Sequence, residues 1–342
     1  MRAFITGVSG PALKDEERAF LREAQPWGLI LFKRNVAAPD ALHRLIDEVR
    51  TTLGRAAPVL IDQEGGRVQR LGPPLWPAYP PGAAYGVVYD GDRQTGLAAA
   101  KLGARLIAAD LAPLGIDVDC MPIADLPVAG ADPVVGDRAY GNEPGKVAAI
   151  AGAIAQGLTE GGVLPVVKHI PGHGRATADS HTKLPVVNAD RAVLEATDFA
   201  VFRPLAALPL AMTAHVVFTA IDPIAPATVS PTIVHDVIRD SIGFQGLLMS
   251  DDISMGALSG SVGERTRAAI AAGCDLVLHC NGEMPEMLAV AAEAPLLAGE
   301  TARRAAAAQA AKKPAAPIDL PAARSEFLEL MAGAWQPARG YA

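Results

Sequence analysis

The sequence predicts an α/β fold, a single (β/α)8 TIM barrel. Eight short apolar runs alternate with stretches of helical character along a chain of 342 residues, half of which are apolar. Most of these runs are nearly continuous in apolar residues, which is typical of parallel strands covered on both faces. Eight such strands with intervening helices match a barrel of this length.

The predicted strands are short, and helical stretches separate them. In chain order the strands are Phe4–Gly7, Gly28–Phe32, Val59–Asp62, Ile116–Cys120, Leu164–Lys168, Leu210–Ala214, Leu247–Ser250 and Leu276–Leu278. The predicted helices are Lys14–Ala24, Ala41–Leu53, Thr95–Ala109, Pro144–Leu158, Arg191–Ala206, Thr232–Ile242 and Val262–Ala272. An open doubly wound sheet is the alternative, but its usual phosphate loops, GxGxxG and GxxxxGK(S/T), do not occur in the sequence.

The whole chain, residues 1–342, is predicted to form one TIM-barrel domain, with a terminal helix and tail from about residue 293. No internal repeat or low-complexity linker divides it. Two long connections, 65–92 and 170–185, are irregular in sequence. Loops of this length in a compact domain are usually functional or disordered.

The composition excludes several classes of protein. The formal net charge is -7, and no cluster of Lys and Arg with interleaved aromatic residues occurs, so we expect no nucleic-acid partner. The apolar run Ala3–Val8 is too short for a signal peptide, and no run approaches the roughly 20 residues that span a bilayer. Cys120, Cys274 and Cys280 lack CxxC spacing. We expect buried thiols in the reducing cytoplasm rather than disulfides or a structural zinc.

Ionisable residues follow four of the predicted strands. Because the active sites of TIM barrels lie at the carboxyl ends of the strands, we expect these side chains to converge on one mouth. Burying charge is costly, so a purely structural barrel has no need for this convergence. The residues are Asp62 and Glu64, Lys168 and His169, His215, and Asp251 and Asp252.

The segment 168–181, KHIPGHGRATADSH, carries the strongest signal for chemistry. Asp179 and His181 are two residues apart, so in an extended segment their side chains point to the same face. A carboxylate beside an imidazole orients the ring and favours its protonated form, which suits proton transfer near neutral pH. On spacing alone, a surface loop whose histidine contacts nothing explains the segment equally well.

The histidines and the paired aspartates leave further alternatives open. Catalytic zinc sites use three protein ligands and one open position, and four histidines of these segments are candidate ligands. If the seventh strand continues through Asp251 and Asp252, only one of them faces the site, as a candidate nucleophile or base. We expect Asp252 to be a loop or helix-capping carboxylate. The candidate zinc ligands are His169, His173, His181 and His215.

Several longer motifs are spread along roughly residues 1–290. They are DQEGGRVQR at Asp62–Arg70, GDRAYG at Gly136–Gly141, KHIPGHGRATADSHTKLP at Lys168–Pro185, AHV at Ala214–Val216 and SDDISMGA at Ser250–Ala257, with LILFKRN at Leu29–Asn35 and AGCDLVLHCN at Ala272–Asn281. Together they resemble the bacterial β-N-acetylglucosaminidase (β-hexosaminidase) branch of glycoside hydrolase family 3.

This resemblance implies a barrel enzyme that hydrolyses glycosides with retention and without a metal or another cofactor. Asp251 would be the nucleophile that forms a covalent glycosyl-enzyme. His181 would be the acid/base, supported by Asp179 on a mobile loop, in place of the second carboxylate that most glycosidases use. The residues implied to bind a terminal N-acetylglucosamine are Asp62, Arg70, Arg138, Lys168 and His169.

The short chain resembles the compact cytoplasmic type of this family. That type implies a small-molecule carbohydrate substrate, the GlcNAc-anhydromuropeptides of peptidoglycan recycling, and a monomeric enzyme. Two positions depart from the commoner pattern: Ile170 stands where Phe is more usual, and no acidic residue follows Met255. Neither position is a proposed catalytic residue, so the assignment stands.

Three rival functions remain open on the sequence. A phosphorylase of the same family would use phosphate in place of water, and a histidine acid/base avoids the repulsion that a glutamate exerts on that anion. A metal-dependent hydrolase would use the histidines as ligands. A non-catalytic sugar-binding barrel would bind without turnover, but it has no physical reason to keep Asp251, Asp179 and His181 together.

Overall fold

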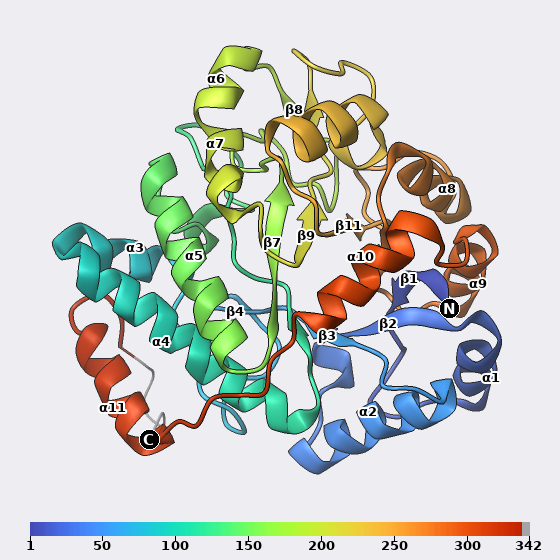
Figure 1. Ribbon diagram of the computed structural model, residues 1–342, viewed down its shortest axis with the longest axis horizontal. Helices are drawn as coiled ribbons and strands as arrows, with labels where there is room; N and C mark the ends of the chain where they lie inside the picture. Colours follow the sequence, from blue (N-terminus) through green and yellow to red (C-terminus); the bar gives the residue numbers. More distant parts are fainter. Residues whose placement is uncertain (337–342) are drawn as a thin grey trace.

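The computed structural model describes residues 1–336, and within them eight parallel strands close into a barrel (Figure 1). Hydrogen bonds link the strands in the order β1, β12, β11, β9, β7, β6, β3 and β2. All eight predicted strands are confirmed, and their ends lie within two residues of the predicted ones. Their bounds are β1 Arg2–Thr6, β2 Pro26–Leu31, β3 Val59–Ile61, β6 Val118–Asp119, β7 Leu164–Ile170, β9 Leu210–Thr213, β11 Leu247–Asp252 and β12 Leu276–His279.

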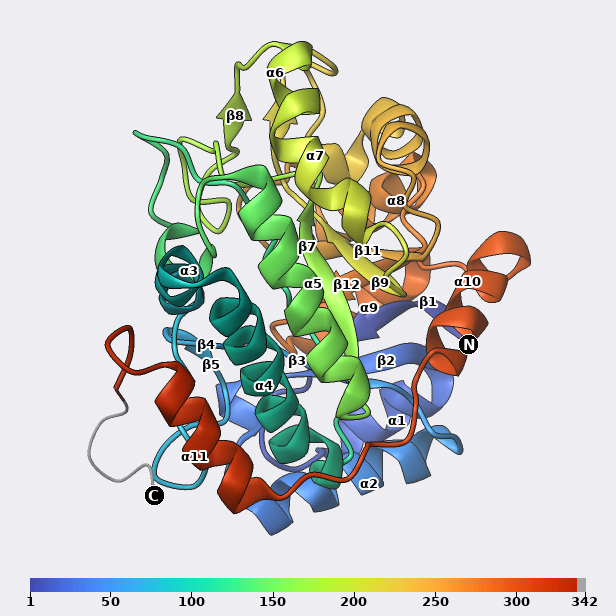
Figure 2. The same ribbon diagram turned by 60° about the vertical axis from the view of Figure 1, so that its left-hand side comes forward.

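Helices surround this barrel (Figures 1 and 2). The predicted helix Arg191–Ala206 is broken at Thr197, where Arg175 donates hydrogen bonds to the hydroxyl of Thr197 and the carboxylate of Asp198. The predicted helix Thr232–Ile242 is π-helical over Ile233–Ser241. The α-helices are α1 Asp15–Ala24, α2 Pro39–Leu53, α3 Gly82–Gly91, α4 Arg93–Leu111, α5 Pro144–Glu160, α6 Arg191–Ala196, α7 Asp198–Phe202, α8 Val262–Ala272, α9 Met284–Glu293, α10 Gly299–Ala310 and α11 Leu320–Leu330.

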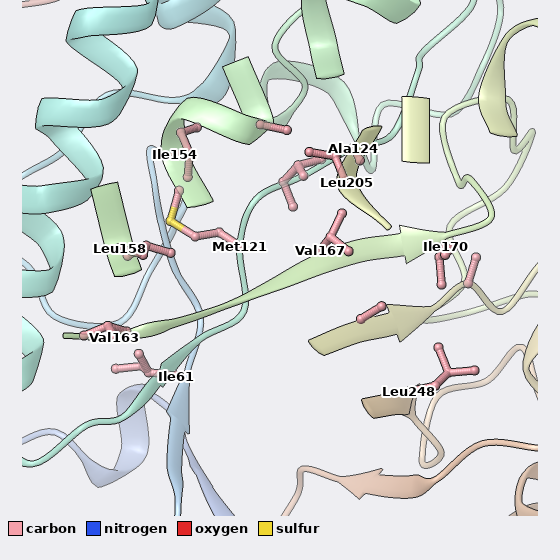
Figure 3. Packing of buried hydrophobic residues seen from close by; sticks show 14 of the residues in the cluster. Ile61, Met121, Ala124, Ile154, Leu158, Val163, Val167, Ile170, Leu205 and Leu248 are labelled. Atoms are coloured by element: carbon pink, nitrogen blue, oxygen red, sulfur yellow. The ribbon is translucent and has the colours of Figure 1, made fainter. Parts of the chain in front are cut away.

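Side chains alternate between two apolar layers along each strand. Leu60 and Val166 point into the barrel, whereas Ile61 and Val167 belong to the layer between strands and helices, which also holds Ile154 of α5 (Figure 3). Both layers exclude water, so both faces of a strand must be apolar. This is why the strands read as continuous apolar runs.

Several helices lie where the sequence shows little periodicity. Helix α3 occupies part of the irregular connection 65–92, and its Gly82 and Gly86 lie against the backbone of the 138–140 segment. A Cβ at these glycines would come within 2.0 Å of the Arg138 carbonyl oxygen and 2.1 Å of the Tyr140 carbonyl oxygen. Helices α10 and α11 occupy the region from about 293 where a terminal helix and tail are predicted, and residues 337–342 of that tail lie outside the described residues.

Two predictions from composition concern burial and membranes. Cys120, Cys274 and Cys280 are buried free thiols, as expected. Among residues 1–336, no helix combines the length and the apolar character needed to cross a membrane.

Two short strand pairs lie outside the barrel at the carboxyl end of its strands. β4 Gln63–Gly65 and β5 Val68–Gln69 form an antiparallel hairpin directly after β3. β8 Val186–Val187 pairs in parallel with β10 Val217–Phe218, and Figure 1 shows β8 beyond the arrowhead of β7. Residues 171–185, here named the β7–β8 loop, therefore run between two anchored strands.

Phe327 of α11 is fully buried and packs near the rings of Tyr79, Tyr85 and Trp335. Phe327→Ala should lower the free energy of unfolding by about 3–5 kcal/mol, because it leaves a cavity that the surrounding rings cannot fill. Urea unfolding measures this loss. Leu328→Ala on the exposed side of the same helix is the control, and equal losses for the two variants would contradict the assigned packing.

Candidate active site

A cavity of about 350 Å³ lies at the carboxyl end of the barrel strands. Seven of the eight residues proposed from the sequence line it, and the eighth, Asp179, is bonded to one of them. The convergence predicted from the polar strand ends is therefore present, except that the buried His215 is not among the residues that line the cavity. The seven are Asp62, Arg70, Arg138, Lys168, His169, His181 and Asp251.

Strand alternation explains how three of these side chains enter the cavity. Inward-facing positions recur every second residue, so the series that fills the barrel continues upward into the mouth. Inward-facing Leu60 and Val166 are followed two residues later by Asp62 and Lys168, and inward-facing Met249 is followed by Asp251. These are the first polar positions on the inner face of their strands.

Lys168 lies at the centre of a buried network of charges. Its Nζ is 2.7 Å from Oδ1 of Asp62 and 2.7 Å from Oε1 of Glu64. Asp62 Oδ2 also accepts a hydrogen bond of 2.9 Å from Arg70. Burial alone would lower the pKa of Lys168, but the two carboxylates raise it above its ordinary value.

Glu64 completes this network; the sequence predicted it at the barrel mouth but gave it no catalytic or sugar-binding role. Both of its carboxylate oxygens accept hydrogen bonds of 2.8 Å from the guanidinium of Arg138, in a bidentate pair. Burial would raise the pKa of Glu64, but Arg138 and Lys168 hold it below the usual range. The sequence does contain the signal: Glu64 stands two residues after Asp62, on the same inward-facing series.

Asp125 is a site residue that the sequence reasoning missed. It is fully buried, and its Oδ2 lies 2.6 Å from Nδ1 of His169 while its Oδ1 accepts the backbone N–H of His173 at 2.7 Å. Burial would raise the pKa of Asp125, but the two histidines lower it to about 2. Asp125 lies beyond the end of β6, without a motif in the sequence to distinguish it from other loop carboxylates.

Asp251 and Asp252 both line the cavity, so the expectation that only one faces it is wrong. The pairing of β11 with β12 shifts register between Met249 and Asp252, which interrupts the simple alternation. Asp252 is nonetheless occupied as a loop carboxylate, because its oxygens accept from the backbone and hydroxyl of Ser254 and from the backbone of Cys280.

Asp251 is held as a carboxylate. Burial would raise its pKa, but the neighbouring imidazoles of His169 and His215 and a 2.8 Å hydrogen bond from the backbone N–H of Asp252 keep the pKa below its ordinary value. Its inward position on β11 and its ionised state give the cavity one anionic group that can face a substrate.

Asp179 and His181 form the predicted pair. Asp179 Oδ1 lies 2.6 Å from His181 Nδ1 and accepts the backbone N–H of His181 at 2.9 Å. The segment is a turn rather than the extended stretch assumed from spacing, since the backbone N–H groups of Thr182 and Lys183 bond the carbonyl of Asp179. The His181 side chain is 63% exposed, so it lies at the open side of the cavity.

The other histidines proposed as metal ligands have protein partners. His215 Nδ1 is 2.7 Å from the Thr228 hydroxyl, and its Nε2 is 3.0 Å from the Asp252 carbonyl oxygen. His173 Nε2 is 2.9 Å from the Ser180 hydroxyl. Within residues 1–336, no three His, Cys, Asp or Glu side chains are grouped as metal ligands would be.

The arrangement combines three chemical functions. Buried charges of both signs line one part of the cavity and offer fixed donors and acceptors for a polyhydroxylated substrate. A half-buried carboxylate, Asp251, and the exposed imidazole of His181, which is paired with Asp179, line the same cavity. This is the composition of an acid/base-assisted displacement site in a barrel enzyme.

Comparison with known proteins identifies the class. Residues 4–311 match the family described as glycosyl hydrolase family 3 N terminal domain. Beta-hexosaminidases from Alkalilimnicola ehrlichii and Methylococcus capsulatus are each 39% identical to the chain, over 81% and 83% of it and 80% and 84% of their own lengths. The chain belongs to glycosyl hydrolase family 3.

Solved structures agree with this membership. NagZ from Neisseria gonorrhoeae in complex with N-trifluoroacetyl-D-glucosamine superposes with a TM-score of 0.87 at 30% identity, covering 97% of this chain and 98% of its own. A family 3 β-N-acetylglucosaminidase from Paenibacillus gives a TM-score of 0.84 at 27% identity, covering 96% of this chain and 66% of its own. Within the family, the chain is a glycoside hydrolase of the β-N-acetylhexosaminidase class.

Removing the charge of Glu64 tests the buried network. Glu64→Gln leaves Lys168 and Arg138 with one carboxylate fewer and should lower the free energy of unfolding by about 3 kcal/mol at pH 7. The matched control is Glu300→Gln, which breaks an exposed ion pair with Arg303 and should change the free energy of unfolding far less, because solvent screens that pair. Urea unfolding of both variants measures the difference.

The difference in stability between wild type and Glu64→Gln should also depend on pH. Asp62 and Glu64 have folded pKa values below their ordinary values of about 4, so their stabilisation is complete above that pH and is lost as pH falls toward the folded values. The gap between wild type and Glu64→Gln should therefore narrow below about pH 4. A gap that widens on acidification would contradict the assigned ion pairs.

Proposed function

We propose that the protein is a retaining exo-β-N-acetylglucosaminidase that releases terminal N-acetylglucosamine from peptidoglycan-derived muropeptides. One observation carries the proposal: a half-buried, ionised Asp251 and His181, which is paired with Asp179, line one cavity whose remaining wall is a network of fixed charges. The family membership supports the same assignment.

In the first step Asp251 acts as the nucleophile. Its carboxylate oxygen bonds to the anomeric carbon of the sugar while the glycosidic C–O bond breaks, and His181 gives a proton to the departing oxygen. Asp179 stabilises the positive charge of the imidazolium before the transfer and orients its ring. The products are a glycosyl-aspartate ester and a neutral aglycone alcohol.

In the second step the roles reverse. Water bonds to the anomeric carbon, His181 takes the proton of that water, and the ester bond to Asp251 breaks. Both steps invert the anomeric carbon, so the product keeps the β configuration. His181 is protonated again at the end, and the enzyme returns to its starting state.

The charged wall is proposed to bind the N-acetylglucosamine ring. Asp62 and the cations beside it offer acceptors and donors to hydroxyl groups, and these bonds can strengthen as the ring flattens toward the oxocarbenium-like transition state. Glu64 and Asp125 hold this set in place. The proposed sugar-binding residues are Asp62, Arg70, Arg138, Lys168 and His169.

The proposed substrate is a GlcNAc-anhydromuropeptide, which a monomeric cytoplasmic enzyme meets during peptidoglycan recycling. The relative from Neisseria gonorrhoeae binds N-trifluoroacetyl-D-glucosamine, which supports an N-acylated glucosamine in the equivalent cavity. Curated relatives of similar length are named beta-hexosaminidase, which supports hydrolysis as the reaction.

Hydrolysis of 4-nitrophenyl N-acetyl-β-glucosaminide in the presence of a chelator tests the reaction itself. Wild type should turn over, and Asp251→Ala should lose activity by at least about 10³-fold because the nucleophile is gone. Asp252→Asn is the matched neighbour, and it should lose less. A folded wild type without turnover, or one that requires phosphate or zinc, would contradict the proposal.

Asp179→Asn tests the acid/base pair. The variant should reduce kcat/KM for a substrate with a poor leaving group by roughly 10²-fold while binding of N-acetylglucosamine is largely kept, because the neutral amide no longer stabilises the imidazolium. Substrates with good leaving groups need little acid assistance and should lose less in this step. Kinetics with phenyl and 2,4-dinitrophenyl glycosides measure the contrast, and equal losses would argue against His181 as the acid.

A further inference from the structure

The β7–β8 loop and the segment after β11 are joined by backbone hydrogen bonds beside the cavity. The backbone N–H of Gly256 bonds the carbonyl of His181 at 3.1 Å, and the N–H of Ala257 bonds the carbonyl of Ser180 at 3.1 Å. This segment directly follows β11, and Asp251 lies in that strand. The proposed acid/base is therefore tied directly to the element that carries the proposed nucleophile.

A second connection reaches the same place through buried side chains. Ser180 is 2% exposed, and its hydroxyl lies 2.9 Å from Nε2 of His173, which is 3% exposed. The backbone N–H of His173 bonds Asp125, and Asp125 bonds His169 in the wall of the cavity. Hydrogen bonds thus run without a break from the proposed sugar-binding wall to the residue between Asp179 and His181.

The dyad itself has little other support. The Asp179 and His181 side chains are 38% and 63% exposed, and they bond one another. Ser180 is the buried residue between them. The bond of its hydroxyl to His173 and the bond of its carbonyl to Ala257 therefore restrict where the exposed pair can lie. Burial lowers the pKa of His173 to about 4, so its ring is neutral at the pH of catalysis and adds no charge to the site.

We propose that Ser180 and His173 are positioning residues that hold the Asp179–His181 dyad at the cavity through the Ser180 hydroxyl. The proposal rests on the proposed function, because the dyad must be the acid/base for its position to matter. Neither residue contacts the reacting atoms in this scheme. Their effect is on how well the imidazole is aimed at the leaving oxygen, where a displacement of about 1 Å costs roughly 10²-fold.

Ser180→Ala is the direct test, because it removes the hydroxyl and keeps the backbone bond to Ala257. Its kcat/KM for phenyl N-acetyl-β-glucosaminide should fall by roughly 10–100-fold. For the 2,4-dinitrophenyl glycoside the loss should stay below about threefold, since that leaving group departs with little acid help. The Kd for N-acetylglucosamine, measured by calorimetry, should not change.

Ser230→Ala is the matched control for the loss of a buried serine hydroxyl. Ser230 is fully buried, donates to Asp222 and accepts from the backbone of Ile233, and does not line the cavity. It should lower Tm without separating the two leaving groups. A merely structural role for Ser180 predicts the same result for both serine variants.

Gly256→Ala tests the position of the dyad from the other side and does not disturb the core. A Cβ at Gly256 would lie 3.0 Å from the His181 carbonyl oxygen and 3.1 Å from that of Thr182, so the loop must shift outward. This variant should show the same dependence on the leaving group as Ser180→Ala. It keeps the test decisive if Ser180→Ala folds poorly.

His181→Ala separates the failure of this proposal from failure of the proposed function. If His181→Ala discriminates between the leaving groups while Ser180→Ala and Gly256→Ala do not, the positioning role is wrong and the acid/base assignment stands. If His181→Ala also fails to discriminate, the proposed function is wrong at its acid/base step, and the positioning role is overturned with it.

Discussion

The buried ammonium of Lys168 is the constraint on which the mouth of the barrel depends. A lone charge at this depth would be far too costly, so the chain must supply counter-charges from other segments. Asp62 directly follows β3, and Glu64 lies in the hairpin that comes next. Glu64 also pairs with Arg138, which lies in a loop that contacts the glycines of α3 closely. One strand end thus fixes three separate segments relative to one another.

Much of this could be predicted from the sequence, because the barrel obeys strong local rules. Because an apolar layer covers each face of the barrel strands, the strands appear in the sequence as continuous apolar runs. Asp62 and Lys168 continue the inward-facing series two residues after Leu60 and Val166. The pairing of Asp179 with His181 was also predicted, although a turn rather than an extended segment produces it. Two residues separated by only one other stay close together in a turn as well as in an extended segment, so their side chains can pair in either backbone conformation.

The rest depends on contacts between distant parts of the chain. Asp125 is a loop carboxylate until folding brings His169, 44 residues later, to it. Helix α3 is stable because its glycines allow the 138–140 backbone to approach, a relation that no local periodicity reveals. The two aspartates at the end of β11 both reach the cavity because a register shift set by the neighbouring strand overrides simple alternation.

The exposed His181 and the buried network around Lys168 differ in how much substitution they can tolerate. The residues proposed to bind the sugar are held in mutual ion pairs, so almost any single replacement leaves an unmatched charge behind. The surface of the β7–β8 loop around His181 is exposed, so a replacement there leaves no buried charge unmatched. Replacements in this loop can therefore alter which aglycone the proposed enzyme accepts, while the proposed binding site for the terminal sugar stays the same.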